Sequence, residues 1–403
     1  MKKISKTSIR NHLTIRYDPT SKFLIPQATP RDFKAISSDP MGLKTENLLK
    51  NSISSISLDE KPIAVALSSG IDSTLCLSLL REIFPKKEII CLCGVFAEGF
   101  DESIQAQKIA KKFDATFKIV HMQSAFETMP ELISISKQPK WNTYNHLIAK
   151  EAKKYSNFLF TGDGADELFG GYVFRYSKFL NLHRPKDPWK IKTVNYLECH
   201  NRDWVPDQEH LFGNSIKFNW NDIYNYFKPY FSNRLSPLQQ VMLADFNGKL
   251  LYDFFPSQST FCKYYGLKGI PVFLDPILIK YALSLPLEQK YDPKTQAGKI
   301  ILRKIARRRK IEHIEEKRGF SPSLWLDWKN HGKKICEKYL LTKESNILKK
   351  NIINYNWIVR AIERIDNDGD QRSLSRMISI LAVEIWIRIM ITKEINGTKK
   401  LKF

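Results

Sequence analysis

The sequence has few cysteines, and their spacing argues against the two commonest structural uses of that residue. The six cysteines are scattered, and none forms a CxxC pair or joins histidines at the spacing of a zinc site. They lie at positions 76, 91, 93, 199, 262 and 336. A disulfide-stapled domain and a structural zinc protein are therefore not expected.

Long apolar runs are also missing. No stretch approaches the roughly 20 apolar residues that a membrane-spanning helix needs. The N-terminal segment MKKISKTSIRNHL is basic but lacks the apolar region of a secretory signal. Internal repeats and low-complexity tracts are absent from the sequence as well. We therefore expect a globular protein of the cytoplasm that has no membrane partner.

Acidic residues are scarce relative to basic ones. The 403 residues include 64 lysines and arginines against 42 aspartates and glutamates, which gives a formal net charge of +22. Such an excess suits a polyanionic partner, such as a nucleotide, pyrophosphate, a nucleic acid or an acidic protein. A solvated basic surface without a specific partner is the alternative, because net charge speaks to solubility and steering rather than to chemistry.

Short apolar runs alternate with segments of helical periodicity in the first half of the chain. Four runs read as buried strands, at residues 63–68, 88–96, 115–121 and 157–162. Helices are predicted between them, at residues 73–84, 101–113 and 144–155. This alternation predicts an α/β protein with a parallel sheet and helices on both faces.

The remaining segments suggest three regions. Residues 1–42 contain four prolines and read as an irregular N-terminal arm. Residues 43–235 would form the α/β core, with an aromatic insertion at about 185–235. Helical periods dominate from residue 236, so residues 236–403 are predicted to be a helical region that completes the fold.

A short polar loop, SSGIDST (68–74), lies between the first predicted strand and its helix. A helix N-terminus in this place presents unpaired N–H groups and a partial positive charge, and small residues let the backbone approach a phosphate. Ser68, Ser73 and Thr74 add hydroxyls, whereas Asp72 would repel a phosphate unless Mg²⁺ lay between them. The Walker pattern GxxxxGK[ST] is absent. The loop is therefore a candidate phosphate site, and a ligand-free helix cap is the alternative.

A second polar segment, TGDGADELFGGY (161–172), follows the fourth predicted strand. Three carboxylates and four glycines in twelve residues are more than a plain turn requires. The carboxyl ends of parallel strands meet at one edge of a sheet, where ligands bind. The acids would hold Mg²⁺ or a cationic group there, and an ordinary acidic helix start is the alternative.

Both segments resemble known motifs. The first is similar to the SGGxDS loop of the ATP pyrophosphatases, with Ser69 in place of a glycine. GDGADELFGGY resembles the signature of the asparagine synthetase family, in its synthetase half. The likeness covers roughly residues 45–330 and includes DESIQAQKIAKKF (101–113), FLDPILIKYALSLP (273–286), GKIILRKIA (298–306) and KRGFSPSLW (317–325).

The resemblance implies a Rossmann-like PP-loop fold and an AMP-forming ligase. Such an enzyme uses ATP and Mg²⁺ to activate a carboxylate as an acyl-adenylate, releases pyrophosphate, and passes the acyl group to a nitrogen. The residues implied to bind the nucleotide are Ser68, Ser69, Gly70, Asp72, Ser73, Thr161 and Gly162.

The resemblance also implies roles for the charged residues. Asp72 and Asp166 match the Mg²⁺ ligands, and Asp163 matches an acidic active-site residue. Lys299 matches a lysine that stabilises charge at the reacting phosphate, and Arg303 lies one turn further along the same helix. A solvated basic helix face is the alternative reading of these two cations.

Two features depart from the family pattern. Glutamine-using members begin with a glutaminase domain whose nucleophilic cysteine is residue 2, whereas residue 2 here is lysine and about 60 residues precede the first loop. We therefore expect nitrogen from free ammonia, a separate glutaminase chain or an amine on another substrate. In residues 257–275, Ser259, Thr260 and Lys263 stand near positions that are acidic, arginine and methionine in the family, which leaves the acceptor open.

Three functions remain compatible with the sequence. The leading one is an asparagine synthetase-like ligase that acts on aspartate or another carboxylate. The second is a relative that adenylates a different acceptor, either as an internal-amine cyclase or as a modifier of tRNA or a peptide. The third is a non-catalytic subunit, against which the intact Asp72, Asp163, Asp166 and Lys299 argue.

Overall fold

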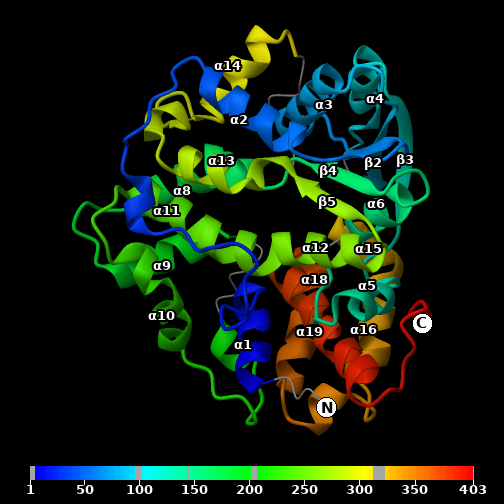
Figure 1. The fold of residues 1–403 in the computed structure, drawn as a ribbon. Helices are drawn as coiled ribbons and strands as arrows, with labels where there is room; N and C mark the ends of the chain where they lie inside the picture. Colours follow the sequence, from blue (N-terminus) through cyan, green and yellow to red (C-terminus); the bar gives the residue numbers. More distant parts are fainter. Residues whose placement is uncertain (1–4, 97–100, 143–144, 201–206, 312–322, 403) are drawn as a thin grey trace.

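The sheet predicted from the sequence forms the centre of the molecule. The computed structural model describes residues 5–96, 101–142, 145–200, 207–311 and 323–402. Five parallel strands stand in the order β3-β2-β1-β4-β5 (Figure 1). Their bounds are β1 Ile63–Ala66, β2 Ile89–Phe96, β3 Thr116–Met122, β4 Phe158–Thr161 and β5 Lys268–Pro271. The parallel sheet and its four predicted strands are confirmed.

The strand order brings two distant loops together. From the central strand β1 the chain proceeds outward to β2 and β3, and it then returns to β4 on the other side of β1. Val65 of β1 and Phe160 of β4 are register partners. The loops that follow β1 and β4 therefore leave neighbouring strands at the point where the strand order reverses, which is the usual ligand crevice of such sheets.

Alternating strand residues enter two separate hydrophobic cores. Val65, Cys91 and Phe160 face a core that includes the inner sides of α2 and α3. Ala64 and Leu159 face the second core, which includes residues of α6, α12 and α19. This alternation follows from the two-residue period of a strand. Helices therefore cover both faces of the sheet, as predicted, with α3 and α4 on one side and α6 and α12 on the other (Figure 1).

Most of the remaining chain is helical. In the first half the helices are α1 Lys6–Ile15, α2 Leu43–Ser54, α3 Ile71–Ile83, α4 Ser103–Lys112, α5 Met129–Ser136, α6 Asn145–Ala152, α7 Ala165–Phe169, α8 Val173–Leu182 and α9 Trp189–Glu198. They continue with α10 Trp220–Phe231, α11 Pro237–Asp245, a π-helix Phe246–Phe254, α12 Phe255–Tyr264, α13 Pro276–Leu283 and α14 Ile300–Arg308.

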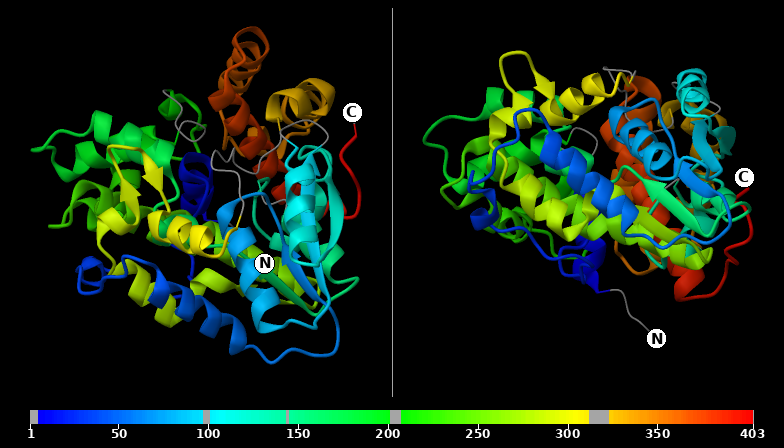
Figure 2. Two further views of the ribbon diagram at one scale, coloured as in Figure 1. Left: turned by 90° about the horizontal axis from the view of Figure 1, so that it is seen from above. Right: turned by 45° about the horizontal axis from the view of Figure 1, so that its top comes forward.

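The C-terminal helices complete the molecule. They are α15 Leu324–Asp327, α16 Lys333–Leu340, α17 Asn346–Lys349, α18 Tyr355–Asp368 and α19 Gln371–Met390. Seen from above, the orange and red C-terminal helices lie on the opposite side of the molecule from the blue α2 (Figure 2, left). The mostly helical second half is confirmed, and its small strands β6 Tyr291–Asp292 and β7 Ala297–Gly298 form a separate hairpin just before α14.

Two elements differ from the sequence expectation. The N-terminal arm is not wholly irregular, because it contains α1. The side chain of Ser5 caps this helix, and Ile9 and Leu13 are buried on a face that packs on α19. A short polar helix of this kind depends on tertiary packing, so its own sequence signals it weakly. The edge strand β5 was also missed, because it has only four residues and ends in Pro271.

Within the described ranges, no helix is long and apolar enough to cross a membrane. Most of the segment KRGFSPSLW, residues 317–322, lies outside the described residues.

Candidate functional site

The loop after β1 is tied to the first turn of α3 by its own hydroxyls. The Ser68 N–H donates to Ser73 Oγ over 3.0 Å, and the two hydroxyl oxygens lie 2.9 Å apart. The Gly70 N–H donates to Ser68 Oγ over 3.2 Å, while the Thr74 hydroxyl donates to the Gly70 carbonyl over 2.8 Å. These bonds hold the predicted phosphate loop in one conformation at the N-terminus of a 13-residue helix.

The loop after β4 lies directly against the first loop. A Cβ atom on Gly162 would lie 2.9 Å from Cβ of Asp72, which explains the glycine at this position. Gly164 has a φ of +91°, a conformation that glycine adopts without strain. The Thr161 hydroxyl donates to Asp163 Oδ2 over 2.7 Å and thereby orients that carboxylate. The two motifs predicted to act together are therefore in contact.

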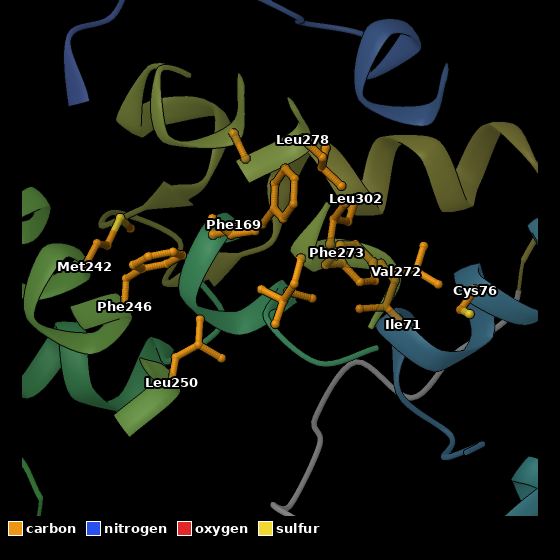
Figure 3. Packing of buried hydrophobic residues seen from close by; sticks show 14 of the residues in the cluster. Ile71, Cys76, Phe169, Met242, Phe246, Leu250, Val272, Phe273, Leu278 and Leu302 are labelled. Carbon is orange, nitrogen blue, oxygen red and sulfur yellow. The ribbon is translucent and has the colours of Figure 1, made fainter. Parts of the chain in front are cut away.

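Three elements that carry the site share one hydrophobic core. Figure 3 shows Ile71 at the start of α3, Phe169 in α7 and Leu302 in α14 in the same cluster. The Phe169 ring packs edge-on against Phe273, with ring centroids 6.0 Å apart. This packing positions both loops and the start of α14 relative to one another.

Lys299 brings the two loops together electrostatically. Its Nζ lies 2.6 Å from Asp72 Oδ2 and 2.6 Å from Asp166 Oδ1. Its backbone has a φ of +54°, and its N–H donates to the Phe169 carbonyl over 3.0 Å. The β7 hairpin and α7 therefore hold the lysine at the exact turn where α14 begins, with its ammonium between the two carboxylates.

Burial and charge act in opposite directions on Lys299. The residue is only 9% exposed, and burial by itself would lower the pKa of its ammonium. The carboxylates of Asp72 and Asp166 outweigh this effect and raise the pKa of Lys299 above its ordinary value. The lysine is therefore a fixed cation at neutral pH.

Arg303 lies where the sequence placed it, one turn along α14. Its N–H donates to the Lys299 carbonyl over 2.9 Å, and its Nε donates to the Gly298 carbonyl over 2.9 Å. The guanidinium therefore stabilises the backbone conformation next to Lys299. A direct role for Arg303 at a phosphate stays a prediction.

A buried polar network lies behind the second loop, and the sequence did not reveal it. We call it the Glu167 network, and its members are Glu167, Tyr172, Arg175, Asp245 and Tyr196. The Tyr172 hydroxyl donates to Glu167 Oε1 over 2.6 Å, and Arg175 lies over the Tyr172 ring, 4.2 Å from its centroid. Arg175 also pairs with Asp245, which accepts from the Tyr196 hydroxyl over 2.7 Å.

One carboxyl group of the Glu167 network, that of Glu167 itself, has a raised pKa. Burial, together with the neighbouring charge of Asp166, raises the pKa of Glu167 to about 8. The group is therefore largely protonated at neutral pH. Glu167 and Tyr172 belong to the motif quoted from the sequence, whereas Asp245 lies 70 residues from Arg175 and carried no local signal.

The predicted site residues are thus assembled in one place. The first loop supplies Ser68, Ser69, Gly70, Asp72 and Ser73, the second supplies Thr161, Gly162, Asp163 and Asp166, and Lys299 joins them. Their roles toward a ligand stay predictions. A glutamate that the sequence analysis did not single out, Glu102, also contacts the first loop through Ser69.

Comparisons with known proteins match most of the chain to one family. A family model described as asparagine synthase matches residues 44–388. A glutamine-hydrolyzing asparagine synthetase of Bacillus subtilis is 24% identical over 437 aligned positions, which cover 97% of this chain and 66% of the relative. The chain thus spans just under two thirds of that relative's length.

Two solved structures align with part of the chain. The NH3-dependent NAD synthetase of Campylobacter jejuni is 15% identical with a TM-score of 0.24, and the alignment covers 42% of this chain and 88% of that one. The NMN synthetase of Francisella tularensis is 15% identical with a TM-score of 0.25, and the alignment covers 57% of this chain and 93% of that one.

Proposed function

Because this chain belongs to the asparagine synthase family, we propose that it is an ATP-dependent ligase that joins a carboxylate to a nitrogen. In the first step a substrate carboxylate oxygen attacks the α-phosphorus of ATP, and the bond to the oxygen that bridges the α and β phosphates breaks. Pyrophosphate leaves, and an acyl-adenylate remains. A nitrogen nucleophile then attacks the acyl carbon and loses a proton, and AMP departs.

The observation that carries this proposal is the convergence of Asp72, Asp166 and Lys299. A loop of small residues at a helix N-terminus suits a phosphate chain, and here Ser68, Gly70 and Ser73 provide it. The carboxylates of Asp72 and Asp166, one from each loop, meet around the buried ammonium of Lys299. Phosphate donors, paired acids and a fixed cation are the parts that nucleotidyl transfer requires.

Lys299 would act on the charge that develops during adenylation. Negative charge gathers on the phosphoryl oxygens in the transition state, and a preorganised cation in a buried position stabilises it most effectively. The left-handed backbone of Lys299 and the bond from its N–H to Phe169 fix the direction of the side chain. The backbone that carries the lysine is therefore fixed before the reaction, and only its side chain would turn toward phosphate when Mg²⁺ binds the two carboxylates.

Asp72 and Asp166 fit a Mg²⁺ ion. Their oxygens are each 2.6 Å from one nitrogen, so they lie at most twice that distance, 5.2 Å, apart. Two ligands of one Mg²⁺ lie within about 4.2 Å of each other, which a small side-chain movement would satisfy. Within the described residues no third His, Cys, Asp or Glu completes a metal cluster, and Mg²⁺ in nucleotide enzymes commonly takes one or two carboxylates plus substrate phosphates. When bound, the ion would neutralise pyrophosphate charge.

The segment that differs from the family pattern supports a carboxylate substrate other than aspartate. The helix α12 carries the altered segment, and its buried residues are Ser257, Gln258, Phe261 and Cys262. Burial raises the pKa of the Cys262 thiol to about 12, and the charge of Asp163 adds to this effect. These residues differ from those of the family's acceptor segment, which supports a substrate other than aspartate. We therefore keep as the second candidate an enzyme that adenylates a different acceptor, including a macromolecule.

Pyrophosphate release from Mg-ATP tests the proposal. The screen offers aspartate, other amino acids, other carboxylates and total tRNA, each with and without ammonia or a glutaminase with glutamine. We expect release with at least one acceptor, and Asp72→Asn should reduce it about 100-fold or more. Asp368→Asn, on the exposed end of α18, is the matched control and should leave the rate unchanged. Equal rates for wild type and Asp72→Asn would overturn the assignment of the site.

A further inference from the structure

The first loop is held by a carboxylate that comes from the neighbouring connection of the sheet. Glu102 Oε2 accepts one bond from the Ser69 N–H over 2.9 Å and a second from the Ser69 hydroxyl over 2.6 Å. Ser69 is 1% exposed and Glu102 is 9% exposed, so both bonds are shielded from water. Because β1 and β2 are adjacent, the start of α4 lies beside the loop that follows β1.

These two bonds use the one residue at which the loop differs from the SGGxDS pattern. A glycine at position 69 would donate only its N–H, whereas serine adds a hydroxyl that reaches the same carboxylate oxygen. Hydrogen bonds to an ionised carboxylate are roughly twice as strong as bonds between neutral groups. The serine at position 69 therefore has a specific partner in Glu102, and the bonds between them fix the peptide that precedes Gly70.

The orientation of this peptide decides which backbone N–H groups of the loop remain available to a phosphate. The Ser69 N–H is turned toward Glu102, and the next N–H, that of Gly70, bonds to Ser68 Oγ. Fixing Ser69 therefore also fixes the position of Gly70 and the entry into α3, where the proposed function places the phosphate donors. An unrestrained loop would have to be ordered when the nucleotide binds, which would weaken binding.

We propose that Glu102 is a positioning residue for ATP and pyrophosphate, acting through Ser69 to hold the phosphate loop in its binding conformation. This inference rests on the proposed function, because it assumes that the loop receives the triphosphate. Glu102 keeps its bonds to Ser69 in the ligand complex and does not itself contact phosphate. The opposite arrangement, in which Glu102 is an internal anion that phosphate displaces, predicts the reverse change in affinity.

Direct binding separates the two arrangements. Mg-ATP and Mg-pyrophosphate are titrated calorimetrically into the wild type, Glu102→Ala, Glu102→Gln and Ser69→Gly. We expect Glu102→Ala to weaken both ligands about tenfold, the equivalent of about 1.4 kcal/mol. Glu102→Gln, which keeps an acceptor oxygen, should recover part of the loss, and Ser69→Gly should have a smaller effect because its N–H remains. Tighter pyrophosphate binding by Glu102→Ala would overturn the proposal.

The pair also predicts non-additivity. If Glu102 acts through Ser69, then Glu102→Ala should change affinity less in the Ser69→Gly background than in the wild type. Asp101→Ala is the matched control, because Asp101 is exposed and its Oδ1 accepts from the Ser103 N–H at the start of α4. It should leave affinity unchanged. Additive losses, or equal losses from Asp101→Ala, would show that only the start of α4 had been disturbed.

The outcomes distinguish this inference from the proposed function. A wild-type protein that binds neither Mg-ATP nor Mg-pyrophosphate would contradict the proposed function itself. A wild type that binds both while Glu102→Ala binds equally well would refute only the role of Glu102. Should Glu102→Ala fail to fold in thermal melts, the milder Glu102→Gln and Ser69→Gly variants carry the same test.

Discussion

Gly171 and Lys299 approach so closely that a single methyl group would not fit between them. A Cβ atom on Gly171 would lie 2.5 Å from Cε of Lys299 and 1.8 Å from Oδ1 of Asp166. Gly171 belongs to the second loop, whereas Lys299 follows the β6–β7 hairpin. The second of the two adjacent glycines in the GDGADELFGGY motif, Gly171, is thus explained by the space that the ion pair of Asp166 and Lys299 needs.

Gly171→Ala should therefore abolish most activity while leaving the fold largely intact. The atoms it displaces are the ends of two side chains, and the side chain of Asp166 is 39% exposed. Under the proposed function, losing the alignment of Lys299 and Asp166 should lower the rate by about 100-fold. Pyrophosphate release measures this effect.

Gly369→Ala is the matched control for that substitution. Gly369 has a φ of +64° and nothing within 4 Å of its added Cβ, so alanine there introduces backbone strain of about 1 kcal/mol without touching the site. It should lower the melting temperature but not the activity of folded protein. A Gly171→Ala enzyme with normal activity would show that Asp166 and Lys299 need not be held together.

Lys299→Met should make the thermal stability of the nucleotide-free protein depend on Mg²⁺. Without the ammonium, the carboxylates of Asp72 and Asp166 face each other at most 5.2 Å apart, which is twice their 2.6 Å distances to the lost nitrogen, and they repel. A divalent cation would relieve this repulsion and stabilise the variant by mass action. Each kcal/mol gained should raise the melting temperature of a chain of this length by about 1 °C.

Thermal melts with and without millimolar Mg²⁺, in the absence of ATP, make this measurement. Lys304→Met is the control, because Lys304 lies on the same helix and its exposed ammonium donates only to the Pro40 carbonyl among the bonds the structure gives it. The shift caused by Mg²⁺ should be larger for Lys299→Met than for Lys304→Met and the wild type. Equal shifts in all three proteins would argue against a metal site at these two carboxylates.

Glu167 should make the stability of the protein fall as the pH rises. Its pKa is raised from 4.5 in the unfolded chain to about 8 in the folded protein, first by burial and then by the charge of Asp166. The folded state thus binds more protons between these values, and the stabilisation is complete below pH 4.5 and lost as the pH rises through 8. The upper limit of this contribution is about 5 kcal/mol.

Glu167→Gln removes this titration while it keeps an acceptor for the Tyr172 hydroxyl. Urea unfolding at pH 5 and pH 8 should show the variant gaining stability relative to the wild type at the higher pH. Glu363→Gln, on the exposed face of α18, serves as the control. A difference between Glu167→Gln and the wild type that does not change with pH would mean that Glu167 is ionised throughout.

The sequence predicted the elements of the site better than their pairing. The strand at 63–66 and the loop that follows it were predictable because a run of five apolar residues, 63–67, is followed by two serines and a glycine, a pattern that depends only on local chemistry. The approach of Lys299 to Asp72 spans 227 residues and depends on the hairpin before α14 and on a left-handed backbone at a lysine. No periodicity encodes such a contact, and only the family resemblance pointed to it.

Other parts escaped prediction because tertiary packing decides them. The partnership of Ser69 with Glu102 requires the order of β1 and β2 in the sheet, and the partnership of Arg175 with Asp245 requires α8 and α11 to pack together. The sequence signalled Ser69 only as a departure from a glycine pattern. Buried polar residues have to find partners wherever the fold provides them, so their identity follows from the structure rather than from spacing.

Lys290 is the one core position at which we expect a substitution to stabilise the protein. Its side chain is 2% exposed, and its ammonium donates to the Leu283 carbonyl over 3.2 Å and lies 5.6 Å from the centre of the Phe33 ring. Burial lowers the pKa of Lys290 from 10.5 to about 7. The unfolded state therefore binds more protons between pH 7 and 10.5, and stability rises with pH across this window.

Lys290→Met replaces the ammonium with an apolar group of similar length and removes this penalty. We expect the variant to be more stable than the wild type by about 1–3 kcal/mol at pH 7, because the lost bond to Leu283 offsets part of the gain. The advantage should shrink as the pH approaches 10, where the wild-type amine is neutral in the folded protein and increasingly so in the unfolded chain. Urea unfolding at pH 7 and pH 10 measures both values, with Lys294→Met, in the exposed turn of the hairpin, as the control. A destabilised Lys290→Met at pH 7 would mean that the buried ammonium contributes more through its contacts than it loses by leaving water.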